Sequence, residues 1–115
     1  MNAPAKTRLL VVDDDRIILA TLVAGLSKAG FDVVVAGNAD EAMKLAVDVQ
    51  PALALLDVEM EGKNGLDVAE FLSRETKVPF MFLSAHGEEA VVRQAASHGA
   101  LGFLVKPLNV AQMVP

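Results

Sequence analysis

The chain has 115 residues, a formal net charge of −5 and no cysteine, and 53% of its residues are hydrophobic while 22% are charged. This composition is typical of one compact domain and excludes a disordered chain, a disulfide scaffold and a thiolate metal site. The acidic balance argues against direct nucleic-acid binding by this segment, because affinity for phosphates needs clustered lysine and arginine. No apolar run reaches the length of a membrane span and the N-terminus lacks an apolar signal core, so we expect a cytoplasmic protein.

Short apolar runs alternate with longer amphipathic stretches along the chain. After an N-terminal tail at 1–7, this alternation predicts β-α units. The strands are predicted at 8–12, 31–36, 52–56, 80–84 and 102–105, and the helices between them at 16–30, 38–49, 66–75 and 88–99. The GKNG segment at 62–65 is predicted to be a turn.

The first helix has helical periodicity, with Ile17, Leu22 and Leu26 as candidate core positions and Gly30 as a C-terminal cap. Asn38 is a good start for the second helix, because its side chain can accept from a free backbone N–H.

Strands of continuous apolar character separated by helices predict a parallel sheet with helices on both faces. Five strands suit the flavodoxin-like α/β fold with strand order 2-1-3-4-5. Residues 108–115 leave room for only one or two turns of a last helix. We therefore expect a single domain over 1–115 with a truncated fifth helix, cut from a longer protein.

Carboxylates follow two strands that should be neighbours in this sheet. Asp13, Asp14 and Asp15 come after the first strand, and Asp57 comes after the third. Asp15 is predicted to cap the first helix, while Asp13, Asp14 and Asp57 should converge. Converging carboxylates repel one another unless a cation lies among them, and hard oxygen ligands favour Mg²⁺, with Mn²⁺ as the alternative.

Two further polar residues end the remaining strands of the predicted sheet. Ser84 ends the fourth strand and Lys106 ends the fifth. A metal, an ammonium group and a hydroxyl around one carboxylate suit phosphoryl transfer, where catalysis is mostly positioning and charge neutralisation. The acceptor would be a carboxylate, which can act as a nucleophile.

In this order and spacing, the residues resemble the receiver domain of bacterial two-component response regulators. The resemblance depends on Asp13-Asp14, Asp57, Ser84-Ala85 and Lys106-Pro107, and it covers the chain except the truncated end. It implies a chemotaxis-regulator-like fold. It also implies a regulatory domain rather than an enzyme, one that catalyses only its own phosphorylation and dephosphorylation.

The resemblance assigns the metal and acceptor roles. Asp57 would be the phosphoacceptor and a metal ligand. Asp14 would bind Mg²⁺ directly and Asp13 largely through water, and the backbone carbonyl of Glu59 would complete the protein ligands.

The resemblance also assigns the switch roles. Lys106 would pair with the phosphoryl oxygens, while Ser84 would move to hydrogen-bond the phosphoryl group and Phe103 would rotate inward with it. Pro107 would follow a cis peptide bond.

Two residues flank the site at positions where the family varies its dephosphorylation rate, namely Glu59 and His86. The chain departs from the family after Met60, where Glu61 stands in place of a frequent proline. This departure adds charge beside the site without removing a reactive group.

The implied function is a signalling switch that takes a phosphoryl group from a sensor histidine kinase or a histidine phosphotransfer protein. Phosphorylation would change contacts with an output domain or partner protein, and a phosphorylation-dependent dimer is also compatible with the resemblance. One alternative is a phosphohydrolase with an aspartate nucleophile, because Glu59 lies two residues after Asp57. That class places its nucleophile after the first strand, however. The other alternative is an unphosphorylated interaction module.

Overall fold

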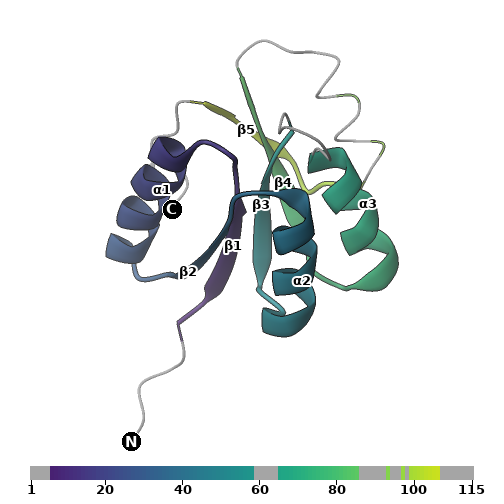
Figure 1. Cartoon of the computed structure of the whole chain (residues 1–115), viewed down its shortest axis with the longest axis horizontal. Helices are drawn as coiled ribbons and strands as arrows, with labels where there is room; N and C mark the ends of the chain where they lie inside the picture. Colours follow the sequence, from purple (N-terminus) through teal and green to yellow (C-terminus); the bar gives the residue numbers. More distant parts are fainter. Residues whose placement is uncertain (1–5, 59–64, 86–92, 94–96, 98, 107–115) are drawn as a thin grey trace, which may run out of the picture.

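A five-stranded parallel sheet forms the centre of the protein (Figure 1). The computed structural model describes residues 6–58, 65–85, 93, 97 and 99–106. The strands are β1 (Arg8–Val12), β2 (Asp32–Ala36), β3 (Leu53–Asp57), β4 (Phe80–Ala85) and β5 (Phe103–Lys106). The described helices are α1 (Arg16–Lys28), α2 (Ala39–Val49) and α3 (Gly65–Glu75). The strand order is β2-β1-β3-β4-β5, which confirms the predicted flavodoxin-like topology.

Two apolar clusters lie on opposite faces of this sheet, and Figure 1 shows α1 apart from α2 and α3. Leu10 and Val12 of β1 contribute to the cluster that includes buried residues of α2 and α3. Leu9 and Val11 contribute to the cluster that includes buried residues of α1. Because successive side chains of a strand point to opposite faces, a strand covered on both sides must be apolar throughout. The continuous apolar runs of the sequence therefore form the strands of the sheet, which helices cover on both faces.

The first helix confirms its predicted start and the predicted glycine after its C-terminus, although it ends at Lys28 rather than at residue 30, and one of its predicted core residues is not buried. Its C-terminus is closed by Gly30, which has a φ of 102° and donates its N–H to the Ser27 carbonyl at 3.0 Å. Leu22 and Leu26 are buried as predicted, but Ile17 is 78% exposed. Five residues of helix turn Ile17 about 140° away from Leu22, whereas Ile18 lies close to the buried face and packs on the core. The prediction for Ile17 was therefore wrong.

Several element boundaries differ from the predicted ones by one or two residues. Asn38 accepts the N–H of Glu41 at 2.9 Å, so α2 begins one residue later, with Asn38 as its cap. Asp57 belongs to β3 instead of following it, because the backbone pairing with β4 extends to the Asp57–Leu83 register. The predicted helix at 88–99 and the truncated fifth helix fall largely or wholly outside the described residues.

Candidate metal and phosphoacceptor site

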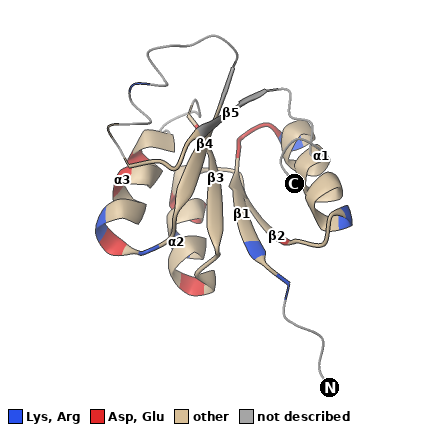
Figure 2. Cartoon of the chain, turned by 180° about the vertical axis from the view of Figure 1, so that it is seen from behind, with Lys and Arg blue, Asp and Glu red and all other residues tan. Residues whose placement is uncertain are grey.

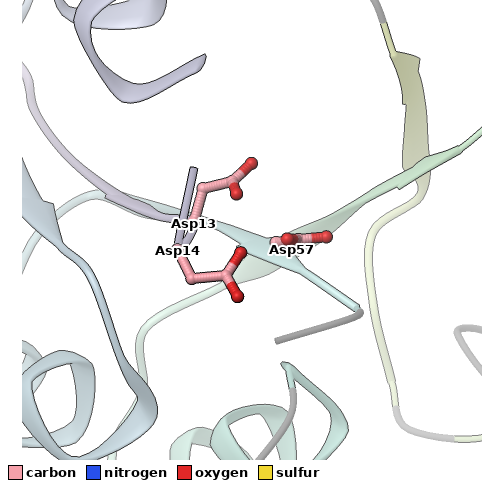
Figure 3. Close-up of side chains that lie close together, drawn as sticks. All are labelled: Asp13, Asp14 and Asp57. Atoms are coloured by element: carbon pink, nitrogen blue, oxygen red, sulfur yellow. The ribbon is translucent and has the colours of Figure 1, made fainter. Parts of the chain in front are cut away.

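The three predicted carboxylates meet at the carboxyl ends of β1 and β3 (Figure 3). These two strands pair directly, with Val12 opposite Leu56, so the residues that end them are brought to the same edge. Asp13, Asp14 and Asp57 each offer one carboxylate oxygen, and these three oxygens lie within 4.8 Å of one another. The prediction that they converge is confirmed.

Asp13 is held by hydrogen bonds of both its backbone and its side chain. Its backbone N–H donates to the Ala36 carbonyl at 3.1 Å, which extends the pairing between β1 and β2 by one residue. Its side chain is fully buried, and Oδ1 accepts the N–H of Asp15 at 3.0 Å. This side-chain-to-backbone bond is an Asx turn, in which an aspartate holds the chain two residues on. The turn therefore fixes the Asp13 carboxylate where the chain leaves the sheet.

The other two acids of the cluster differ in their exposure. Asp57 is 5% exposed, while Asp14 belongs to the exposed residues. The cluster therefore borders solvent at Asp14. Figure 2 shows the acidic segment that joins β1 to α1 at this edge of the sheet.

Asp15 serves the helix, as predicted. Its Oδ1 accepts the N–H of Ile17 at 2.9 Å and that of Ile18 at 3.2 Å, and its backbone has the extended conformation of an N-cap. These bonds satisfy two of the backbone donors that the first turn of a helix leaves free. The acidic triplet is thus divided between the cluster and the helix cap.

Replacing Asp15 with alanine is expected to lower the free energy of unfolding by about 1 kcal/mol, because the cap is lost. Urea denaturation followed by circular dichroism measures this change. Asp15→Ser should stay close to the wild type, since serine also caps helices. Stabilisation by added Mg²⁺ should be unchanged in both variants. If Asp15→Ala abolished that stabilisation, Asp15 would belong to the metal site, and its assignment to the helix cap alone would be wrong.

The donor set of the cluster fits a hard divalent cation. All three groups that the described residues bring together here are carboxylates. Oxygen-only ligands are the set that Mg²⁺ and Mn²⁺ prefer, and Mg²⁺ commonly keeps several waters beside one or two carboxylates. Three like charges this close are also costly, since two unit charges at 4.8 Å repel by about 3.5 kcal/mol at an effective dielectric constant of about 20. A bound cation would offset that repulsion.

The backbone pairing brings two of the other predicted residues to the same edge of the sheet. In the register of β4 and β5, Ser84 pairs with Val105 and Ala85 pairs with Lys106. Since β4 also pairs with β3 beside Asp57, Ser84 and Lys106 lie at backbone positions on the edge that carries the cluster. Phe103 is the first residue of β5. Glu59, His86 and Pro107 lie outside the described residues, and the roles predicted for them stay predictions.

One residue beside the cluster was assigned a different role from the sequence. Gly65 was predicted to end a turn, but it is the first residue of α3, and it is buried against the backbone of Asp57. The spacing of a glycine eight residues after an aspartate gives no local signal for such a contact. A sequence pattern shows that glycine can turn the chain, while only the packing shows what lies against it.

A surface cavity of about 450 Å³ lies away from this site, among the C-terminal ends of α2 and α3 and the segments that follow them. Val47, Gln50, Thr76 and Lys77 are among its lining residues. The acidic cluster therefore does not belong to this cavity. Among the residues that the structure describes, no helix combines the length and apolar character needed to cross a membrane.

Comparison with known proteins identifies the class to which this fold and this acidic edge belong. The sequence model of the response regulator receiver domain family matches residues 9–115, so the chain belongs to that family. Membership implies phosphoacceptor signalling in two-component systems, and receiver domains are regulatory rather than classical enzymes. The family typically uses Mg²⁺.

Individual relatives agree with this assignment. The chain is 30% identical over 115 residues to the transcriptional regulatory protein PdtaR of Mycobacterium tuberculosis, covering 99% of this chain and 56% of PdtaR. It is 33% identical over 109 residues to the DNA-binding response regulator MtrA of Mycobacterium leprae, covering 95% of this chain and 48% of MtrA. The chain thus spans about half the length of these relatives.

A solved structure gives the same fold. The chemotaxis protein CheY4 of Vibrio cholerae superposes with a TM-score of 0.86 at 25% identity, covering 96% of this chain and all of that one (100%). The predicted chemotaxis-regulator-like fold is confirmed.

Proposed function

We propose that this domain is a switch that accepts a phosphoryl group on Asp57 from a phosphohistidine. The donor would be a sensor histidine kinase or a histidine phosphotransfer protein. The observation that supports Asp57 as the acceptor is its position in the acidic cluster: it ends a central strand and shares the edge with Asp13 and Asp14. Of the three acids, Asp57 is the one contributed by β3, between the strands that carry the other proposed groups.

The proposed transfer is a displacement at phosphorus. A carboxylate oxygen of Asp57 attacks, the bond between phosphorus and the histidine nitrogen breaks, and the departing imidazole keeps the electron pair and takes up a proton. The residues that would hold Mg²⁺ are Asp13, Asp14, Asp57 and the backbone carbonyl of Glu59. When bound, the cation neutralises charge on the transferring group and on the acceptor. Lys106 would pair with the phosphoryl oxygens from β5.

The phosphoryl group on Asp57 would then contact residues of β4 and β5 and change their conformation. Ser84 would hydrogen-bond it and Phe103 would turn inward, which shifts the equilibrium between two states of the surface that these strands carry. Glu59 and His86 would flank the site and tune the loss of the phosphoryl group. Pro107, after a proposed cis bond, would hold Lys106 in place.

Phosphorylation would change which partner the domain binds, rather than start catalysis of a further reaction. PdtaR and MtrA are named as a transcriptional regulator and a DNA-binding response regulator, which supports an output domain or partner protein that controls transcription. With a net charge of −5, this segment itself would not bind nucleic acid. A phosphorylation-dependent dimer is one form that the output would take. We place the switch in the cytoplasm, where ATP supplies phosphoryl groups to histidine kinases.

The experiment is Mg²⁺-dependent phosphorylation with acetyl phosphate, followed by intact-mass spectrometry. We expect the wild type to gain one phosphoryl group and Asp57→Asn to gain none, because a carboxamide is not a nucleophile here. Asp48→Asn is the charge-matched control, since Asp48 is an exposed residue near the far end of α2, and it should behave like the wild type. An adduct of equal yield on Asp57→Asn, or no adduct on the wild type with Mg²⁺, would refute the proposal.

A further inference from the structure

Gly65 lies where the helix α3 meets the end of the strand that carries Asp57. A Cβ atom built on Gly65 would overlap the carbonyl oxygen of Asp57, and it would lie 2.9 Å from the carbonyl carbon and 3.1 Å from the Cα of Val58. Real Cβ atoms are essentially never found under 3.0 Å from such atoms. Only glycine therefore fits between the first turn of α3 and the Asp57–Val58 peptide.

The backbone at Asp57 and Val58 is also held by hydrogen bonds. The N–H of Val58 donates to the Leu83 carbonyl of β4 at 3.1 Å, and the N–H of Gly65 donates to the Val58 carbonyl at 3.2 Å. The backbone at the proposed acceptor is therefore fixed between β4 and the start of α3. The second of these bonds also joins residues 58 and 65 across residues 59–64 of the chain.

The helix has little freedom to move away from this contact. Val68, Ala69 and Leu72 of α3 are fully buried in the cluster that includes β3 and β4. Close-packed interiors transmit strain and do not absorb it locally. A side chain at position 65 would therefore force the Asp57–Val58 peptide, the start of α3 or both to shift.

We propose that Gly65 is a positioning residue for phosphoryl transfer. Its missing side chain lets α3 hold the Asp57 backbone so that the carboxylate stays in register with Asp13 and Asp14. This inference rests on the proposed function of Asp57, and it adds a residue that touches neither metal nor phosphate. A misplacement of about 1 Å at a reacting group can cost about a hundredfold in rate.

The test compares Gly65→Ala with Gly37→Ala in phosphorylation by acetyl phosphate and in Mg²⁺ titration. Gly37 follows β2 near the same edge, has open space around a built Cβ and has no positive φ, so alanine should be tolerated there. We expect Gly65→Ala to be phosphorylated about a hundredfold more slowly. We expect it to bind Mg²⁺ about tenfold more weakly, because a misplaced Asp57 would be a poorer metal ligand. Gly37→Ala should stay within about twofold of the wild type in both.

A third variant, Leu72→Ala, distinguishes a shift of Asp57 from a general loss of stability of the protein. It removes a fully buried side chain of the same helix without adding an atom beside Asp57. While folded, it should keep the wild-type phosphorylation rate. Equal rates in Gly65→Ala and the wild type would overturn the inference, and so would a rate in Leu72→Ala as low as that of Gly65→Ala. A wild type that takes no phosphoryl group would instead overturn the proposed function.

If Gly65→Ala does not fold, amide hydrogen exchange of the wild type decides the matter. The amide of Gly65 should be protected, and its exchange should slow further when beryllofluoride and Mg²⁺ are added, because the phosphoryl mimic would bind at Asp57. Exchange of Gly65 that is unchanged by beryllofluoride would overturn the inference.

Discussion

Asp13→Asn is expected to stabilise the protein in the absence of metal and to remove most of the stabilisation that Mg²⁺ gives to the wild type. Asparagine keeps the shape of the side chain and an oxygen for the N–H of Asp15, so the turn after β1 is preserved. It removes a negative charge that is fully buried beside two other carboxylates. We expect a gain of about 1–2 kcal/mol without metal, which is less than the bare repulsion because screening reduces it.

The stabilisation that Mg²⁺ gives should be smaller in Asp13→Asn than in the wild type. A ligand that binds only the folded state stabilises it by about 2.7 kcal/mol at a concentration a hundredfold above its dissociation constant. Wild-type protein should therefore show a rise in Tm with Mg²⁺, and Asp13→Asn should show little of it. Thermal unfolding with and without Mg²⁺, with a chelator in the metal-free sample, measures both effects.

Asp48→Asn controls for the change of net charge, because it removes the same charge from an exposed position on α2. It should keep the full Mg²⁺ response. If Asp13→Asn were stabilised by Mg²⁺ as strongly as the wild type, Asp13 would not contribute to the metal site. A loss of stability in its metal-free form would contradict the repulsion that we infer among the three carboxylates.

Phe82→Ala is expected to lower the free energy of unfolding by about 3–5 kcal/mol. Phe82 is fully buried in β4 opposite Leu56, and its ring packs edge-on against Phe80 with centroids 5.8 Å apart. The loss combines the transfer of a large apolar side chain with the cavity that it leaves. Since native domains are stable by about 5–15 kcal/mol, this one change removes a large share of the total.

Urea denaturation is the measurement, and the midpoint should fall while the dependence on urea stays the same. Phe82→Leu should lose less than Phe82→Ala, because leucine fills part of the cavity. Val47→Ala is the exposed control on α2, where half of the side chain is already in solvent, and it should change stability by no more than about 0.5 kcal/mol. A loss in Phe82→Ala as small as that of Val47→Ala would show that the space left by the ring closes.

Local chemistry explains which features could be predicted from the sequence. Asp15 caps α1 and Asn38 caps α2 through bonds to residues two or three positions away, so nothing distant is needed to predict them. The continuous apolar character of the strands reflects burial on both faces, and this predicts a parallel sheet before any contact is known. Topology rules then predict the strand order, and with it the edge at which Asp13, Asp14 and Asp57 meet.

The predictions that failed concern how far a strand extends and which side chains of a helix face the sheet. Ile17 and Ile18 are neighbours of the same type, and only the orientation of α1 on the sheet decides that Ile18 packs inward while Ile17 is exposed. Asp57 looked like the residue after a strand, because charge is costly within a sheet. Pairing with β4 keeps it in the strand.

The sequence by itself therefore determined the fold class, the caps and the identity of the acids, because each follows from periodicity or from short-range bonds. Only the tertiary structure decided how near those acids come, how deeply each is buried, and that Gly65 must be glycine. These properties depend on distances between segments that are far apart in the chain. Asp57 and Gly65 show this most clearly, because their contact is set by where α3 packs on the sheet.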